Sequence, residues 1–326
     1  MITKLTIENF KSIKMLTMDC RRVNVFIGEP NTGKSNILEA LGILSWCGSG
    51  AGYLSDFVRY RSLPNLFYDE LLDEPVAIEA AGRPAVGIRI GFEKDAFFFR
   101  ESGGRDAFAV LNHNGAATRE GVQPSHAQPV RFYRFKEAGR FDGTEAEYLM
   151  PPDGRNLFSL VFASRRFREM MQEFFKPYGL TVVFRPQEKR FEVQKQADGV
   201  VVSYPYTLTA DTLQRVIFYT MAIASNKESV LVFEEPESNA FPYYTKQLGE
   251  RIALDDSNQY FIATHNPYLL RAIVEKGKRE DVNVAVTYFR GYRTLVKCLA
   301  QEQLDELLDA DPFFNLSAFL EEDAPA

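Results

Sequence analysis

The 326-residue sequence is poor in the residues that build disulfide frameworks and metal clusters. It contains three histidines and three cysteines, and the cysteines (Cys20, Cys47 and Cys298) lie far apart without a C-x-x-C pair. These counts exclude a disulfide-rich secreted domain, a cysteine-based zinc site and a His-rich metal centre. The sparse cysteines are typical of a reducing compartment, and we expect a cytoplasmic protein.

Long apolar runs are also missing. No stretch approaches the ~18 consecutive apolar residues of a transmembrane helix. The first eight residues alternate polar and apolar side chains, which is unlike the apolar centre of a signal peptide. We therefore expect a soluble protein that does not use a membrane as a partner.

The net charge is small, −6, and is unevenly distributed. Residues 301–326 contain eight acidic side chains and no lysine or arginine, so the rest of the chain is close to neutral. An acidic tail on a near-neutral body does not exclude an anionic partner such as DNA. Hydrophobic residues at 45% and charged residues at 25% are ordinary globular values and exclude a disordered chain.

The sequence pattern divides the chain into two segments typical of an α/β core and, between them, a segment typical of β-hairpins. Residues 1–50 and 205–300 alternate apolar strand-like runs with helically spaced segments. Residues 51–204 contain short apolar runs separated by Gly, Pro, Asp and Asn, which predicts antiparallel hairpins, and they also contain helical patterns. We predict a discontinuous core (1–50 and 205–300), an inserted lobe (51–204) and an acidic tail (301–326).

The tail leaves two alternatives open. It carries the apolar residues Phe313, Phe314, Leu316 and Phe319, which either dock on the body or belong to a frayed terminus.

The most specific motif is Gly28-Glu29-Pro30-Asn31-Thr32-Gly33-Lys34-Ser35, which fits G-x-x-x-x-G-K-S/T. It follows a strand-like segment and opens a helical pattern. In such a loop, backbone N–H groups turn inward around phosphates and the helix N-terminus adds partial positive charge. We predict that Gly28 through Asn36 bind nucleotide, with Lys34 at the β/γ-phosphates and Ser35 at Mg²⁺.

A second motif is the apolar run Val230–Phe233, which ends in Glu234 and Glu235. A buried strand with carboxylates at its carboxyl end is the expected partner of a phosphate loop. The first acid is placed to hold Mg²⁺, and the second is placed to polarise the attacking water. The alternative is an exposed acidic turn, which the following Pro236-Glu237-Ser238-Asn239 disfavours.

A third strand-like run ends in Thr264-His265-Asn266. A histidine at this place can hydrogen-bond a γ-phosphate oxygen or the attacking water. A lone histidine at a strand end is more often structural. The position of His265, after the Glu-Glu strand and one helix, favours the catalytic interpretation.

These three motifs in this order, with Ile7-Glu8-Asn9-Phe10-Lys11-Ser12-Ile13 at the start, resemble the ABC-type ATPase head of the RecF, SMC and overcoming-lysogenisation-defect (OLD) class, also called AAA family ATPases. The segment Pro151–Leu157 is similar to one found in RecF-like heads. The resemblance covers roughly residues 1–45 and 205–300. It implies a P-loop NTPase head with a mixed, largely parallel sheet, an antiparallel β lobe and a helical insertion.

The resemblance also implies ATP and Mg²⁺ as ligands. Under it, Glu234 takes the Walker B position, Glu235 is the catalytic base and His265 is the switch residue. The family usually has Asp where Glu234 stands, and Glu keeps the charge while adding one methylene group.

A larger departure concerns the signature motif, through which this class contacts the γ-phosphate of a partner subunit with a Ser and a Gly-containing turn. The best match is Leu208-Thr209-Ala210-Asp211-Thr212-Leu213-Gln214-Arg215. Thr209 can replace the Ser hydroxyl, whereas Asp211 stands where Gly is usual and repels a phosphate that it faces. The sequence therefore predicts ATP binding with slow hydrolysis across a homodimer.

Two functions follow from these expectations. The first is a Mg-ATPase whose ATP-driven dimerisation acts on DNA or a DNA-processing partner, in genome maintenance or phage defence. The second is a nucleotide-gated module that regulates a partner nuclease or toxin. A transporter ATPase is disfavoured because the Gly-rich signature is missing and the hairpin-rich insertion is long.

Two basic segments bear on a DNA partner. Residues 131–136 interleave bases and aromatics, as nucleic-acid surfaces do, but a half-buried strand has the same pattern. Arg165, Arg166 and Arg168 cluster on one predicted helix, where a solvated face is the alternative.

Overall fold

The structure is a computed structural model that describes residues 1–49, 52–83, 85–120, 130–145, 147–309, 313 and 316–320. At its centre is a six-stranded sheet in the order β16-β15-β3-β14-β13-β9. The strands from β15 to β9 run parallel, and β16 is antiparallel to β15. The bounds are β3 Val23–Ile27, β9 Val130–Tyr133, β13 Val230–Glu234, β14 Gln259–Ala263, β15 Val282–Arg290 and β16 Arg293–Cys298.

The central strands are short and apolar, and β3 and β14 are buried along their whole length. A sheet of parallel strands buries both faces, so continuous apolar runs are what such strands need. Because the strands run in one direction, the segments that follow β3, β14, β13 and β9 all start from the same edge of the sheet.

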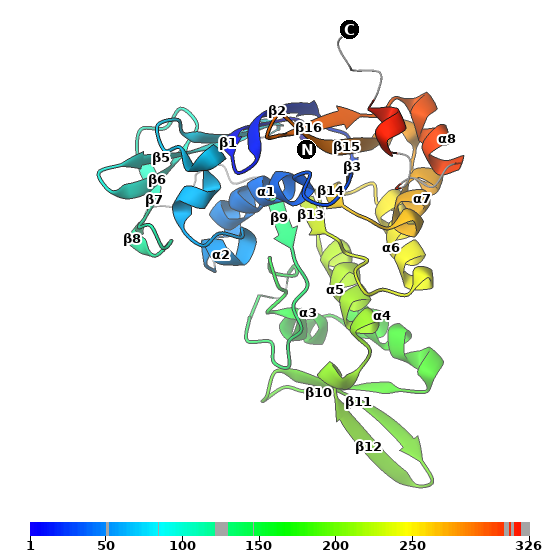
Figure 1. Cartoon of the computed structure of the whole chain (residues 1–326). Helices are drawn as coiled ribbons and strands as arrows, with labels where there is room; N and C mark the ends of the chain where they lie inside the picture. The colour runs from blue at the N-terminus through cyan, green and yellow to red at the C-terminus, as the bar shows by residue number, and fades with distance from the viewer. Residues whose placement is uncertain are drawn as a thin grey trace.

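A seven-stranded antiparallel sheet, β2-β1-β4-β5-β6-β7-β8, lies over one face of the centre (Figure 1). Helix α1 (Lys34–Ser49) packs between the two sheets, with Leu38 and Leu41 in one core with Leu5 of β1 and Phe261 of β14. The expected pairing of the N-terminal strands is confirmed, with Leu5 opposite Met18. The bounds are β1 Ile2–Phe10, β2 Ile13–Asp19, β4 Val76–Gly82, β5 Val86–Glu93, β6 Ala96–Glu101, β7 Ala107–Leu111 and β8 Ala117–Glu120.

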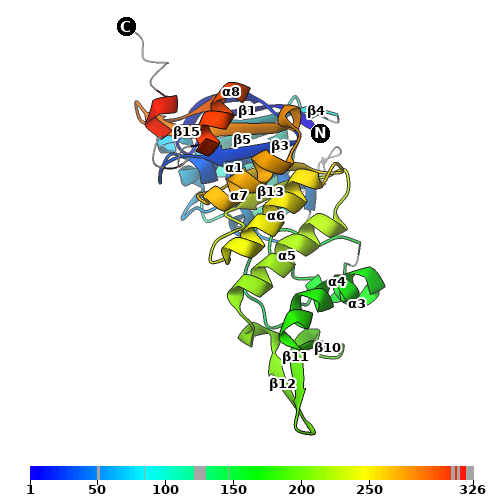
Figure 2. The same cartoon turned by 90° about the vertical axis from the view of Figure 1, so that its right-hand side faces the viewer.

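Helices cover the other face of the central sheet, where α5, α6 and α7 lie side by side (Figure 2). Helix α7 begins at an Asn266 cap, whose side chain accepts hydrogen bonds from the N–H groups of Tyr268 and Leu269. Helices α6 and α7 both start with proline, the residue preferred at the first helical position. The bounds are α5 Asp211–Ser225, α6 Pro242–Leu254, α7 Pro267–Lys276 and α8 Gln301–Asp309.

A smaller lobe lies at the N-terminal end of α5, away from the central sheet (Figure 1). It contains two helices and an antiparallel three-stranded sheet: α3 Leu157–Ala163, α4 Arg165–Phe175, β10 Thr181–Arg185, β11 Arg190–Ala197 and β12 Val200–Pro205. The remaining short helices are α2 Leu54–Phe57, η1 Leu63–Leu66, η2 Tyr68–Glu70, η3 Lys176–Tyr178, η4 Tyr206–Leu208, η5 Arg279–Asp281 and η6 Leu316–Phe319.

The expected α/β fold, with a mixed central sheet, an antiparallel β lobe and a helical insertion, is confirmed. The sheets cross the expected domain boundaries, since β1 and β2 share a sheet with β4–β8, and β9 joins the central sheet. The division into core and insertion therefore remains a prediction. None of the helices in the described ranges is both long and apolar enough to cross a membrane.

The described part of the tail docks on the body. Leu304 and Leu307 of α8, with Leu316 and Phe319, are buried in the core beside α7. Phe313 packs against the same core, and Phe314 lies outside the described residues.

Candidate nucleotide-binding and catalytic site

The predicted phosphate loop connects the end of β3 to the start of α1, and two of its glycines are sterically required. Gly33 has a φ of +97°, and a Cβ there would lie 2.0 Å from the Oγ1 of Thr294. Gly28 has a φ of +152°, and its Cβ would lie 2.3 Å from the carbonyl oxygen of Thr287. Only glycine fits these positions without moving the neighbouring strands. The sequence spacing thus corresponds to a specific backbone geometry.

Lys34 lies inside the loop. Its Nζ donates hydrogen bonds to the carbonyl oxygens of Gly28 (2.9 Å) and Glu29 (2.8 Å), and the side chain is buried. Burial lowers the pKa of Lys34 to about 8, against the opposing effect of the Glu235 charge. Within the described ranges this ammonium group has no carboxylate hydrogen bond and faces carbonyl oxygens, so it is well placed to exchange them for phosphate oxygens.

The other predicted loop residues divide into two groups. Glu29, Pro30 and Asn31 are exposed at the tip of the loop. Thr32 is buried and its hydroxyl donates to the carbonyl of Glu29 (2.9 Å), which closes the turn. The Asn36 side chain donates to the Ser12 hydroxyl (2.7 Å), and so it is used to hold α1 against the β1–β2 turn.

Glu234, at the end of β13, is almost enclosed by hydrogen-bond donors. Its Oε2 lies 2.7 Å from Nη2 and 3.1 Å from Nε of Arg134, and its Oε1 lies 3.0 Å from Nη2 of Arg59. The Ser35 side chain is close enough to help lower the pKa of Glu234. Burial raises the pKa of Glu234, but the two arginines and these hydrogen bonds outweigh burial and hold the pKa below its ordinary value.

Ser35 and Glu234 therefore meet, as the sequence predicts for residues that share a metal ion. A hydroxyl and a carboxylate are oxygen donors of the kind that Mg²⁺ prefers, with further positions filled by water and phosphate. The extra methylene of Glu, compared with Asp, does not prevent the contact with Ser35. The donor set fits Mg²⁺.

Glu235 lies in a different environment from its neighbour. Its backbone has a φ of +43°, an uncommon conformation for a non-glycine residue, and its side chain is 47% exposed. The Ser238 hydroxyl donates to its Oε2 (3.1 Å), and Nε2 of His265 lies 3.6 Å from its Oε1. Such strain is typical of functional sites, because the surrounding structure must hold it in place.

His265 follows β14 and adjoins both Glu235 and Lys34. Burial and the Lys34 charge lower the pKa of its imidazole, against the effect of Glu235. The ring is therefore neutral at pH 7, and it can both donate and accept a hydrogen bond.

Glu237 was not among the predicted site residues. It is 6% exposed, and its Oε1 accepts hydrogen bonds from the Thr264 hydroxyl (2.5 Å) and the His265 N–H (3.3 Å). Its Oε2 is buried without a hydrogen-bond partner among the described residues. Burial raises the pKa of Glu237 to about 7. In the sequence, Glu237 stands in the turn after Glu234 and Glu235. This position alone does not predict that its side chain is buried.

Sequence reasoning also missed the cations around Glu234. Arg134 directly follows β9, whose Phe132 and Tyr133 are buried, so the half-buried-strand interpretation of this segment is confirmed. Arg59 follows the short helix α2. The available signal for Arg134 was a base within the strand-like segment 131–136, but its neighbour in the sheet was not predictable from spacing.

The signature-like residues lie at the start of α5. The Thr209 hydroxyl donates to the carbonyl of Tyr206 (2.7 Å), and Asp211, the first residue of the helix, lies 3.5 Å from Nε of Arg215. A negative charge in the first turn of a helix interacts favourably with the helix dipole, so Asp211 stabilises α5. A contact of either residue with a nucleotide held by a second copy stays a prediction.

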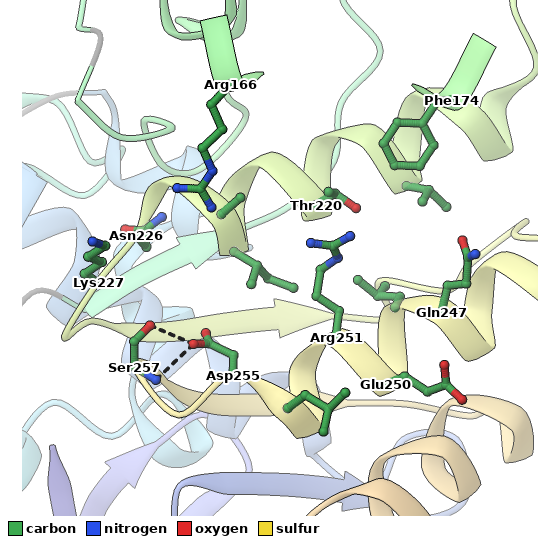
Figure 3. Close-up of a pocket in the computed structure, with 15 residues that line it drawn as sticks. Arg166, Phe174, Thr220, Asn226, Lys227, Gln247, Glu250, Arg251, Asp255 and Ser257 are labelled. Carbon is green, nitrogen blue, oxygen red and sulfur yellow. Dashed lines mark hydrogen bonds between the residues drawn. The ribbon is translucent and has the colours of Figure 1, made fainter. Parts of the chain in front are cut away.

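The three clustered arginines of α4 do not form one basic face. Arg165 pairs with Glu169 (2.7 Å), and Arg168 donates to the carbonyl of Phe162. Arg166 points toward Arg251 across a groove of about 550 Å³ between α4, α5 and α6 (Figure 3).

Comparisons with known proteins bear on the family and the fold of the chain. Residues 1–47 match a family model described as an AAA ATPase domain. The DNA replication and repair protein RecF of Leptospira interrogans serogroup Icterohaemorrhagiae serovar Lai (strain 56601) is 32% identical over 97 residues. That match covers 28% of this chain and spans only 27% of the relative's length.

Solved structures of SMC heads share the fold. One is an Smc head bound to the C-winged helix domain of ScpA, with a TM-score of 0.54 and 15% identity, covering 93% of this chain and 99% of that one. Another is an Smc head with an extended coiled coil, bound to the C-terminal domain of ScpA derived from Pyrococcus furiosus. It has a TM-score of 0.53 and 13% identity, covering 94% and 98% of the two chains. The chain therefore has the fold of an SMC-type P-loop ATPase head.

Proposed function

We propose that the protein binds and hydrolyses Mg-ATP, and that ATP joins two copies of the chain into a dimer that acts on DNA. One observation carries the ATPase part. The phosphate loop, Glu234, Glu235 and His265 lie at the carboxyl ends of β3, β13 and β14, three parallel strands of one sheet, and so they share its carboxyl edge. Ligands of open α/β sheets bind at this edge.

The chain's own groups divide the chemistry. Lys34 and the backbone N–H groups of the loop bind the β/γ-phosphates. Ser35 and Glu234 hold Mg²⁺, which, when bound, neutralises charge on those phosphates. Glu235, exposed and flanked by His265 and Ser238, accepts the proton of the attacking water. His265, kept neutral by burial and by Lys34, orients that water or a γ-phosphate oxygen.

The dimer rests on the position of Thr209 and Asp211. The resemblance to RecF/SMC-like heads assigns this turn to the γ-phosphate of a partner copy. The Thr209 hydroxyl already bonds to Tyr206, and Asp211 brings a negative charge, so we expect hydrolysis to be slow.

The DNA part rests on relatives alone. RecF is named for DNA replication and repair. Genome maintenance and phage defence are the two settings that we propose for this chain.

ATP turnover measured with and without DNA, for the full chain and for Lys34→Ala, tests the proposal. We expect slow hydrolysis that DNA accelerates and that Lys34→Ala abolishes. Turnover that survives Lys34→Ala would remove the assignment of the site.

The second candidate is a nucleotide-gated module that regulates a partner nuclease or toxin. Asp211 at the signature position favours it, because a poor trans contact suits a switch that is reset slowly. ATP-dependent dimerisation without any effect of DNA on turnover would select this candidate over the first.

A further inference from the structure

A network of three cations and two carboxylates surrounds the predicted metal-binding acid. Its members are Lys11, Arg59 and Arg134, with Glu39 and Glu234. The cations exceed the carboxylates by one. This surplus positive charge lies beside the phosphate loop, because Glu39 stands one helical turn after Ser35 on α1 and Ser35 is close enough to Glu234 to lower its pKa.

Glu39 anchors the network. It stands one helical turn after Ser35 on α1, and its side chain is fully buried. Lys11 pairs with its Oε2, while Nε of Arg59 (2.6 Å) and Nη2 of Arg134 (3.4 Å) lie near its Oε1. A buried carboxylate needs such partners, so Glu39 holds the arginines where they also reach Glu234.

Arg134 is the more firmly held of the two arginines at Glu234. Its side chain is 29% exposed against 60% for Arg59, and its guanidinium lies 5.0 Å from the centre of the Phe132 ring. It makes two of the three arginine hydrogen bonds to Glu234. Both carboxylate oxygens are therefore already engaged by guanidinium groups.

We propose that Arg134 competes with Mg²⁺ for Glu234, so that the site loads metal weakly. The inference rests on the proposed nucleotide site and concerns its regulation. A divalent cation that approaches Glu234 meets two fixed positive charges within hydrogen-bond distance of the same carboxylate. Even in a well-screened site, one such charge weakens divalent binding by about tenfold.

Titration with Mn²⁺, followed by electron paramagnetic resonance in the presence of ADP, tests the competition. We expect Arg134→Gln to bind Mn²⁺ about tenfold more tightly than the native chain. Arg134→Lys, which keeps the charge, is the matched control and stays near the native affinity. Equal or weaker Mn²⁺ binding by Arg134→Gln would overturn the proposal, because Arg134 would then position Glu234 for the metal.

A second measurement does not depend on the stability of Arg134→Gln. In the native chain, the ¹⁵N resonance of the Arg134 Nε, assigned with Arg134→Lys, should shift when Mg²⁺ is added to the ADP complex. An unchanged resonance at saturating Mg²⁺ would also overturn the competition.

Failure of the proposed function is distinguishable from failure of this inference. If ADP does not bind in the presence of a chelator, the nucleotide site is wrong. The same Mn²⁺ titration without nucleotide then still compares Arg134→Gln with Arg134→Lys.

Discussion

Glu234 and Glu235 are adjacent in the chain, yet they occupy opposite kinds of environment. Glu234 is 12% exposed and accepts hydrogen bonds from two arginines, whereas Glu235 is 47% exposed and borders a neutral histidine. The strand places the first acid against the sheet and α1, and the positive φ of the second turns it outward. The two neighbouring acids therefore acquire different chemistry. Glu234 is positioned to bind a cation, whereas Glu235 is accessible to water.

The largest expected effect concerns Lys34, the cation of the phosphate loop, whose charge interacts with that of Glu235. Lys34→Ala removes the ammonium group inside the loop, and we expect ATP affinity to fall by more than about 100-fold, since a buried charge–phosphate contact is lost. Isothermal titration measures this change. Lys227→Ala, on an exposed lysine, is the control and should bind ATP normally. Unchanged affinity in Lys34→Ala would end the P-loop assignment.

The buried Glu237 extends the comparison between Glu234 and Glu235. It accepts hydrogen bonds from Thr264 and from the N–H of His265, the residue that adjoins Glu235. Its folded-state pKa, about 7, exceeds that of an unfolded Glu, about 4.5, so the folded state binds the extra proton between these two pH values. The stability from this group should therefore be fully present at and below about pH 4.5 and be lost as the pH rises toward 7.

Glu237→Gln should abolish this fall. Between about pH 5 and pH 8, its free energy of unfolding should rise by on the order of 2 to 3 kcal/mol relative to that of the native chain. Chemical unfolding at several pH values measures it. Ser238→Ala, at a neighbouring residue without the buried charge, is the control. Parallel pH profiles for the native chain and Glu237→Gln would show that Glu237 is not the titrating group.

The smallest expected effect concerns Asp211, which tests whether the start of α5 faces the nucleotide of a second copy. Asp211→Asn removes a negative charge from the predicted trans contact, and we expect ATP turnover to rise a few-fold, as about 1 kcal/mol of repulsion implies. Glu250→Gln, which changes a charge on α6, should leave turnover unchanged. A rise at low protein concentration only, or none at all, would count against the trans contact.

The parts of the site that follow from chain order were predictable. Gly28 to Ser35 carry the spacing of a phosphate loop, and parallel strands bring their ends to one edge, so Glu234, Glu235 and His265 were predicted to lie near it. The starts of α6 and α4 also carry local signals, because a proline opens α6 and Ser164 caps α4.

The rest depends on which segments become neighbours. Arg59 and Arg134 reach Glu234 only because β9 pairs with β13 and α2 packs on α1, and no local pattern states either fact. The burial of Glu237 likewise depends on Thr264, 27 residues away. Helix α8 was missed because its charges resemble a solvated tail, although Leu304 and Leu307 are buried.

The division of roles between the two acids is tested most directly by comparing Glu234→Gln with Glu235→Gln in single-turnover hydrolysis over a range of Mg²⁺ concentrations. Glu235→Gln should bind Mg-ATP like the native chain and hydrolyse it ~10²–10⁴-fold more slowly at every Mg²⁺ concentration, because an amide cannot accept the proton of water. Glu234→Gln should lose activity mainly at low Mg²⁺ and recover part of it at high Mg²⁺. Full activity in Glu235→Gln, with a loss in Glu234→Gln that Mg²⁺ does not relieve, would contradict the account.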